Sequence, residues 1–341
     1  MRLDRARSRR RDRCRAMPPA APTRVTIRLP PSTTPSSRVQ PWRKMPTAHN
    51  GRLGRITLAC HNVRDESQMS DMTALDRLGF GCVGLSLAST PRQALSLLAA
   101  VHDHGISYFD TAPLYGRGYS ERLLGRFLRS RRDKVTVATK FGLSATPPPL
   151  PMELALPLAA LRRRLRPRPA GVASPPQEPP ADIVSSRRIG RAEVETAFDA
   201  SRRALGTDYI DVYLLHEEVP AALEPAAVDF LQGLKASGAV RKLGIAANGG
   251  RYRSLGPADV AGWDVLQYEF GPAWPWTANL PARFPAMQHV FHSVLRGVST
   301  TDPAAPGRTL ASCLAACPTA RVLFSSTKVA HIEANLRALR G

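Results

Sequence analysis

Residues 108–128 read YFDTAPLYGRGYSERLLGRFL. A short apolar run, Ile106–Phe109, enters this stretch and predicts a β-strand, and a loop containing Gly and Pro follows it. After Ser120, which we expect to cap a helix, apolar residues recur at helical spacing. They are Leu123, Leu124, Phe127 and Leu128. This part of the chain is therefore predicted to be a strand, a loop and an amphipathic helix.

The same strand–helix unit recurs on both sides of this stretch. We predict strands at residues 78–85, 106–109, 135–139, 209–215, 240–246, 263–267, 289–295 and 322–324. The predicted helices include residues 194–205, 223–236, 309–316 and 329–339. Strands that are apolar throughout are typical of a parallel sheet covered on both faces. Eight such units in about 265 residues favour an α/β fold, a closed (β/α)8 TIM barrel over residues 73–341.

A doubly wound open sheet is the rival fold. Gly79, Gly81 and Gly84 form the string G-x-G-x-x-G that is typical of dinucleotide-binding loops. The predicted pattern does not start a helix directly at Gly84, and it lacks an acidic residue at a strand end about 20 positions later. The string alone is a weak signal, so we prefer the barrel.

Half of the net positive charge lies at the N-terminal end. The chain carries +21, and residues 1–72 contribute +11, from 15 Arg and one Lys against five acidic residues. Arg alternates there with Pro, Ser and Thr without apolar periodicity, so we expect a disordered extension. It is a charge-based binder of nucleic acid or acidic membrane, a targeting segment, or a non-native extension upstream of a start at Met69 or Met72. We favour the last interpretation over a nucleic-acid partner.

A second unusual segment is Leu143–Ser186, which is rich in Pro and Arg and longer than a barrel loop needs. It follows the third predicted strand, and therefore lies on the rim where the active sites of such barrels sit. Met152–Leu165 is a candidate helix within it. The segment is either a lid over the mouth of the barrel or a solvated insertion.

Several classes of protein are disfavoured. No run of about 18 apolar residues is present, so we expect no transmembrane helix and no membrane partner. The five cysteines are scattered and odd in number, which argues against a disulfide framework and favours the cytoplasm. Cys313 and Cys317 lie four apart on a predicted helix without further ligands at metal-binding spacing, so we assign them to the core and predict no metal.

Four polar residues fall at or just after the ends of predicted strands, and a barrel brings such positions around one mouth. They are Asp110, Tyr115, Lys140 and His216. Carbonyl reduction needs a proton donor at oxygen as hydride reaches carbon, and a Tyr phenol becomes a better acid beside an ammonium group. Asp110 would orient Lys140, and His216 would polarise the carbonyl. Taken singly, each residue has an ordinary structural explanation, so the catalytic hypothesis depends on all four residues occurring together.

Four motifs carry a specific resemblance. They are residues 108–128, quoted above, VTVATKFG (135–142), RRALGTDYIDVYLLH (202–216) and VRKLGIAAN (240–248). Together they closely resemble the aldo-keto reductase family, over about residues 77–339 without the insertion. The resemblance implies a (β/α)8 barrel that moves hydride between a nicotinamide cofactor and a carbonyl. It also implies that Asp110, Tyr115, Lys140 and His216 are the catalytic tetrad.

The resemblance further implies residues that hold the nicotinamide. Gln267 matches the amide ligand after the sixth strand. The usual Ser-Asn pair after the fifth strand is replaced by Ala246 and Ala247, with Asn248 as a substitute one position later. His292 stands where the family often stacks a Tyr on the nicotinamide.

The last unit, LFSSTKVAHIEANL (323–336), resembles the segment that binds the adenosine phosphate. Three hydroxyl residues precede the final helix, whose N-terminus favours an anion: Ser325, Ser326 and Thr327. Lys328 adds a positive charge, and Asn335 matches the adenine ligand. A plain helix cap is the alternative. Because a 2′-phosphate would gain from Lys328, we expect NADP(H) in preference to NAD(H).

Other loops are left to choose the substrate, a small carbonyl compound or sugar. The candidates are residues 143–186, residues 216–223 and the aromatic segment 270–276. In the last of these, Trp274 and Trp276 either stack on the substrate or anchor the loop. We predict an NADP(H)-dependent oxidoreductase that interconverts an aldehyde or ketone and an alcohol. The alternative is a catalytically weak, cofactor-binding regulatory subunit, which the altered nicotinamide residues favour and the complete tetrad opposes.

Overall fold

The computed structural model describes residues 73–143, 150–165, 187–299 and 301–340. The disordered extension predicted for residues 1–72 lies outside the described residues. The same holds for residues 144–149 and 166–186 of the insertion.

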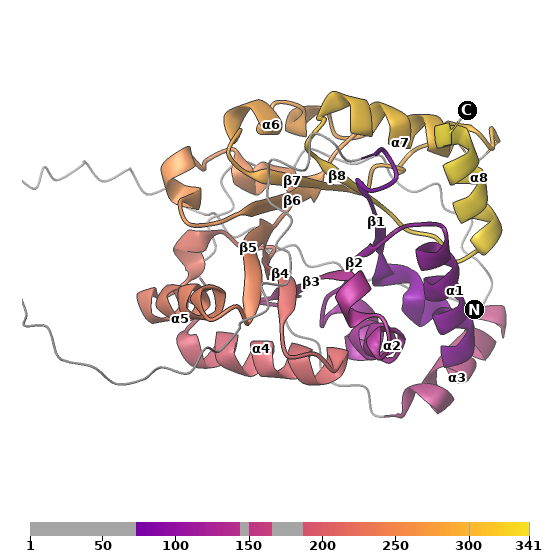
Figure 1. Ribbon diagram of the computed structural model, residues 1–341, viewed down its shortest axis with the longest axis horizontal. Helices are drawn as coiled ribbons and strands as arrows, with labels where there is room; N and C mark the ends of the chain where they lie inside the picture. Colours follow the sequence, from indigo (N-terminus) through magenta and orange to yellow (C-terminus); the bar gives the residue numbers. More distant parts are fainter. Residues whose placement is uncertain (1–72, 144–149, 166–186, 300, 341) are drawn as a thin grey trace, which may run out of the picture. The chain divides into compact units, whose positions relative to one another are not determined.

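Eight parallel strands pair with their neighbours in sequence order and close into a barrel, because β1 also pairs with β8 (Figure 1). The strands are β1 (Leu78–Gly81), β2 (Tyr108–Asp110), β3 (Thr136–Phe141), β4 (Ile210–His216), β5 (Val240–Ala246), β6 (Val265–Glu269), β7 (Gln288–His292) and β8 (Arg321–Phe324). The predicted (β/α)8 barrel is therefore confirmed, and the open doubly wound sheet is excluded.

Helices surround the strands. They are α1 (Pro91–Asp103), α2 (Tyr119–Leu128), α3 (Met152–Leu165), α4 (Arg191–Leu205), α5 (Pro225–Ala236), α6 (Leu280–Arg283), α7 (Ala305–Ala316) and α8 (Val329–Arg340). Local signals start and stop them. At α1 the Thr90 hydroxyl accepts a hydrogen bond from Gln93 N (3.2 Å), while Ser89 N donates to Gln93 Oε1 (2.8 Å). Helix α4 ends at Gly206, whose φ of 62° is left-handed and suits glycine.

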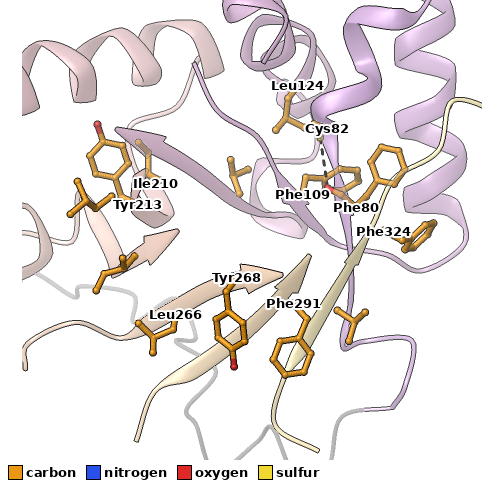
Figure 2. Packing of buried hydrophobic residues seen from close by; sticks show 14 of the residues in the cluster. Phe80, Cys82, Phe109, Leu124, Ile210, Tyr213, Leu266, Tyr268, Phe291 and Phe324 are labelled. Atoms are coloured by element: carbon orange, nitrogen blue, oxygen red, sulfur yellow. Dashed lines mark hydrogen bonds between the residues drawn. The ribbon is translucent and has the colours of Figure 1, made fainter. Parts of the chain in front are cut away.

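Side chains along each strand point alternately outward and inward, which produces two separate apolar layers. On β4, Tyr213 and Leu215 face outward and pack in the large cluster beneath the helices, which Figure 2 shows around Tyr213, Tyr268 and Phe291. Val212 and Leu214 point the other way, into a smaller cluster that fills the barrel interior. A strand buried on both faces is apolar throughout, which is why period-2 polarity is missing from the sequence.

The glycines of β1 make room inside the barrel. A Cβ on Gly79 would lie 2.5 Å from Leu323 Cδ2 and 2.8 Å from Tyr108 Cδ1, and one on Gly81 would lie 2.5 Å from Ser325 Oγ. The G-x-G string at this strand thus serves the close approach of β2 and β8 side chains.

Two local expectations were wrong. The first predicted strand continues to residue 85, but the chain turns into a 3-10 helix, η2 (Cys82–Leu87), directly after Gly81. Ser120 does not cap α2, because Gly118 occupies the N-cap position. The Ser120 hydroxyl instead donates to Cys82 O (3.0 Å) and exchanges a hydrogen bond with Thr111 Oγ1 (2.8 Å). Helix formation after β2 is therefore tied to the β1 loop.

The helix expected within the insertion is present as α3. Its buried side chains are Met152, Leu156 and Ala160, and it contacts η2 and α1. Tyr119 donates to Leu150 O (2.5 Å), and Arg163 donates to Leu87 O (2.7 Å).

Candidate functional site

A cavity of about 410 Å³ opens at the carboxyl ends of the strands. Six of its lining residues stand two positions after a side chain of the interior cluster, so the alternation of each strand aims them inward. They are Asp110, Lys140, His216, Gln267, His292 and Ser325. Tyr115 joins them from the loop after β2. The structure thus brings all four members of the predicted tetrad to one cavity, with three of the predicted cofactor residues.

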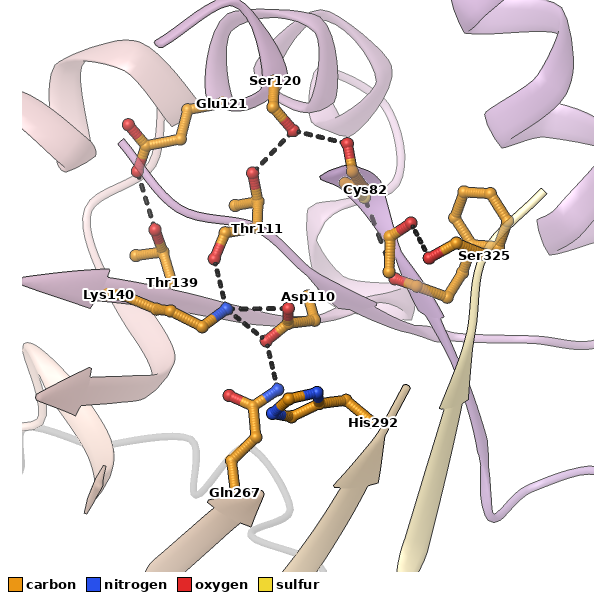
Figure 3. Close-up of polar contacts among 12 residues, drawn as sticks. Cys82, Asp110, Thr111, Ser120, Glu121, Thr139, Lys140, Gln267, His292 and Ser325 are labelled. Carbon is orange, nitrogen blue, oxygen red and sulfur yellow. Dashed lines mark hydrogen bonds and ion pairs between the residues drawn. The ribbon is translucent and has the colours of Figure 1, made fainter. Parts of the chain in front are cut away.

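Asp110 and Lys140 form a buried ion pair between the adjacent strands β2 and β3. Lys140 Nζ lies 2.7 Å and 2.9 Å from the two carboxylate oxygens and also donates to Thr111 O at 2.9 Å (Figure 3). Burial by itself would lower the pKa of Lys140, but the neighbouring Asp110 carboxylate and hydrogen bonds to Asp110 and Tyr115 raise it. Lys140 is therefore charged and held in one orientation.

Tyr115 lies over this ion pair. It begins the 3-10 helix η3 (Tyr115–Gly118), and Lys140 Nζ is 4.8 Å from the centroid of its ring. Burial raises the pKa of Tyr115 above its ordinary value, while Lys140 acts in the opposite direction. The ammonium group thus has the expected effect on the phenol, but burial outweighs it. The ring of His216 meets Tyr115 edge to face, with centroids 6.3 Å apart.

Two histidines of the cavity are neutral. Burial, with a contribution from the Lys140 charge, lowers the pKa of His216 to about 3 and that of His292 to about 3. His216 Nδ1 is buried without a hydrogen-bond partner, and His292 Nδ1 lies 3.0 Å from Ser293 Oγ. A neutral imidazole can donate from one nitrogen and accept at the other.

Gln267 is coupled to the ion pair. Its Nε2 donates to Asp110 Oδ2 at 2.9 Å (Figure 3), and its Oε1 is buried without a partner. A carboxylate only accepts hydrogen bonds, so this contact fixes which end of the amide is the nitrogen. An unsatisfied acceptor in the cavity wall is a place for a ligand donor.

Asn248, expected as the substitute amide ligand, is not among the lining residues. Its backbone N and its Nδ2 both donate to Glu217 Oε2, each at 3.3 Å. Glu217 itself lines the cavity. The sequence analysis named the loop 216–223 as one of the substrate loops but did not single out Glu217. Its position directly after His216 was a usable signal.

Left-handed backbone conformations concentrate at the same rim. Within the described ranges, the non-glycine residues with positive φ are Arg117 (57°), Glu217 (57°) and Ser293 (54°). Each follows a residue of the cavity within two positions. Such conformations cost roughly 1–2 kcal/mol each and cluster at functional sites.

The segment between β8 and α8 is only partly in the cavity. Ser325 lines it and donates to Gly81 O (2.8 Å; Figure 3). Ser326 Oγ accepts from Lys328 N (3.1 Å), and Lys328 is exposed. Asn335 lies on α8 and is 6% exposed. The predicted residues Ser326, Thr327, Lys328 and Asn335 are thus close in sequence to the cavity but do not line it.

A buried hydrogen bond joins β3 to α2 beside the cavity residues. Glu121 on α2 is buried, and Thr139 Oγ1 donates to its Oε1 at 2.7 Å (Figure 3). Burial raises the pKa of Glu121, opposed by the hydrogen bond from Thr139 and by the Lys140 charge. Sequence reasoning did not single out Glu121, because an acidic residue in the first turn of a helix is commonplace.

The two tryptophans of the aromatic segment anchor their loop. Trp274 is buried, its Nε1 donates to Ser293 O (3.2 Å), and its ring meets Trp276 edge to face at 5.6 Å. Neither lines the cavity. The described residues hold no cluster of His, Cys, Asp and Glu suited to a metal ion, and none of the helices described there is long and apolar enough to cross a membrane. Described residues of α3 do not line the cavity either, and a lid built from residues 144–149 or 166–186 lies outside the described residues.

Comparison with known proteins identifies a family whose model matches this chain. Residues 77–276 match the model of the aldo/keto reductase family. D-threo-aldose 1-dehydrogenase of a Pseudomonas species is 31% identical over 180 residues, which are 50% of this chain and 50% of that protein. The chain therefore spans about half the length of this curated relative.

Solved structures show the same fold. An aldo-keto reductase of Bacillus halodurans in its holo form is 20% identical, with a TM-score of 0.53, covering 78% of this chain and 87% of that one. An aldo-keto reductase of Klebsiella pneumoniae in complex with NADPH is 17% identical, with a TM-score of 0.52, covering 80% of this chain and 89% of that one.

Proposed function

Because the chain belongs to the aldo/keto reductase family, we propose that it is an NADP(H)-dependent oxidoreductase that interconverts an aldehyde or ketone and an alcohol. The observation that carries this proposal is the convergence of Tyr115, His216 and the Asp110–Lys140 ion pair on one cavity. Its substrate is a small carbonyl compound or sugar.

Tyr115 is the general acid and base in this proposal. Its hydroxyl gives a proton to the carbonyl oxygen during reduction, and its phenolate takes one from the alcohol during oxidation. The phenolate that forms is stabilised by Lys140, whose charge Asp110 maintains by an ion pair of 2.7 Å. His216, neutral at physiological pH, donates a hydrogen bond to the same oxygen, which polarises the carbonyl.

The residues present fit a nicotinamide cofactor, which supplies the hydride when bound. Gln267 Oε1 is a buried acceptor without a partner, suited to the carboxamide NH2. His292, at the end of the next strand, offers a flat, neutral imidazole ring on which the nicotinamide could stack. Ser325 and the N-terminal end of α8 would receive the phosphates, because backbone N–H groups and the helix dipole favour anions there.

We infer a preference for NADP(H) over NAD(H) from Lys328. This exposed cation precedes α8, and no carboxylate in the described part of the chain pairs with it. A 2′-phosphate offers such a lysine a counter-charge. Asn335 and the hydroxyls of Ser326 and Thr327 complete the proposed adenosine-phosphate site.

The test compares the full-length protein with the variant Tyr115→Phe. We expect saturable quenching of tryptophan fluorescence by NADPH in both proteins, with dissociation constants that agree within about twofold. Turnover of a panel of aldehydes, ketones and aldoses should fall at least about 100-fold in the variant, because the proton donor is lost. Equal loss of cofactor affinity would contradict the role of Tyr115. Tight NADPH retention without turnover of any carbonyl would favour the regulatory subunit instead.

A further inference from the structure

The wall of the cavity formed by β4, β5 and β6 presents hydrogen-bond acceptors. Ala246, at the end of β5, lines it with a methyl group only, and Asn248 does not line it. Besides His216, which is assigned above to the carbonyl oxygen, Gln267 and Glu217 are the polar side chains of this wall. This is the wall from which a nicotinamide carboxamide would be held if, as proposed above, the cavity takes such a cofactor.

Gln267 offers the cavity an acceptor without a partner. Its Nε2 donates one N–H to Asp110 Oδ2 at 2.9 Å, and its Oε1 is buried without a partner. One end of the amide is therefore fixed by a carboxylate that cannot donate. A ligand group that meets Gln267 Oε1 must supply an N–H or O–H.

Glu217 offers a second acceptor. Its Oε2 accepts two hydrogen bonds from Asn248, one from the backbone N and one from Nδ2, at 3.3 Å each. Its other carboxylate oxygen makes no hydrogen bond to any described residue. The left-handed backbone of Glu217 (φ 57°) follows His216 directly, while Glu217 N continues the strand ladder to Ala246 O at 2.7 Å. The side chain is thus placed at the rim by a conformation that is costly for a non-glycine residue.

We propose that Glu217 binds the nicotinamide carboxamide, accepting one of its two N–H donors while Gln267 accepts the other. An NH2 group carries two donors, and this wall carries two acceptors. Glu217 thereby takes the role of carboxamide ligand that was expected for Asn248. Asn248 donates to the Glu217 carboxylate and does not line the cavity. This inference rests on the proposed function.

A purely structural role for Glu217 makes a different prediction. If the carboxylate only held the loop after β5 through Asn248, its loss would change stability and weaken every nicotinamide nucleotide alike. A carboxamide acceptor instead discriminates between nucleotides with and without the amide NH2. The 3-acetylpyridine analogue of NADP+ keeps the ring and the carbonyl but has a methyl group in place of that NH2.

The experiment measures binding of NADP+ and of its 3-acetylpyridine analogue by calorimetry, with full-length wild-type protein, Glu217→Gln and Glu217→Ala. In Glu217→Gln the donors of Asn248 claim the glutamine oxygen, so the glutamine nitrogen faces the carboxamide NH2, donor against donor. The matched control is Glu269→Gln. Glu269, at the end of β6, also accepts from a loop amide (Gly249 N, 2.9 Å) but does not line the cavity.

We expect the wild type to bind the analogue about 10- to 100-fold more weakly than NADP+, the range for a hydrogen bond to a charged acceptor. In both Glu217 variants NADP+ should weaken while the analogue changes little, so that the ratio falls at least about fivefold; Glu269→Gln should keep the wild-type ratio. An unchanged ratio in the Glu217 variants, with NADP+ still binding to the wild type, overturns this inference alone. Failure of the wild type to bind NADP+ or NADPH overturns the proposed function, and this inference with it.

Discussion

Lys140 Nζ lies 2.7 Å from Asp110 Oδ1, and the side chains of Lys140 and Asp110 are 3% and 4% exposed. They come from neighbouring strands, at positions that point into the barrel beyond the interior apolar layer. A charge buried this deeply is stable only with its partner, because desolvation of a lone ion costs several kcal/mol. The pair is therefore a structural element of the barrel as well as part of the proposed catalytic site.

Removing one member of this pair should be worse than removing both. We expect Lys140→Met to lower the free energy of unfolding by about 3–5 kcal/mol, because Asp110 is left buried without its counter-charge. The double variant Asp110→Asn/Lys140→Met should recover part of that loss, while turnover stays abolished in both. Urea denaturation and steady-state rates check this. Additive losses of stability in the double variant would show that the two charges do not interact.

The rate of carbonyl reduction should be level across neutral pH. Tyr115 keeps its proton below a pKa that burial raises above the ordinary value of about 10, and His216 is already neutral above its pKa of about 3. Reduction should therefore slow only at alkaline pH, as Tyr115 loses its proton, and alcohol oxidation should accelerate there. Profiles of kcat/KM in both directions test this. An inflection of the reduction profile near pH 6.5 would mean that His216 titrates in the free enzyme.

Stability should fall in acid because of the cavity histidines. The folded protein depresses the pKa of His216 to about 3, so below the unfolded value of about 6.5 the unfolded chain binds the extra proton. The contribution of His216 is present above about pH 6.5 and is lost toward about pH 3, by up to about 1.4 kcal/mol per pH unit. His216→Gln should flatten the fall of Tm between these values. The same change at exposed His331 serves as the control and should leave the slope as it is.

Lys328 should distinguish the two nicotinamide cofactors. We expect Lys328→Ala to weaken NADPH binding about fivefold, the size of one exposed charge contact of about 1 kcal/mol, and to leave NADH unchanged. Lys328→Arg preserves the charge and should retain the preference. Fluorescence titration of each variant with both nucleotides measures the ratio. A parallel loss of NADH affinity would place Lys328 away from the 2′-phosphate.

Much of the fold could be predicted from the sequence. Strand β5 was predicted at its observed bounds, and β4 within one residue at each end, because strands buried on both faces are continuous apolar runs. The prediction failed after Gly81, where the chain forms η2, which contacts α2 and α3 and buries only Cys82 and Leu85 of its apolar side chains. Apolar side chains alone do not distinguish a buried 3-10 turn from a buried strand.

The sequence by itself determined the order of eight strands and the polar residues at their ends, since a side chain two positions beyond an interior residue must point into the same barrel. Only the tertiary structure decided which of those groups share a hydrogen bond. Gln267 meets Asp110 across 157 positions of the chain, and Asn248 meets Glu217 across 31. Which end of an amide side chain is left without a partner depends on whether a carboxylate from a neighbouring part of the barrel accepts its N–H, and that is set only when the strands pair.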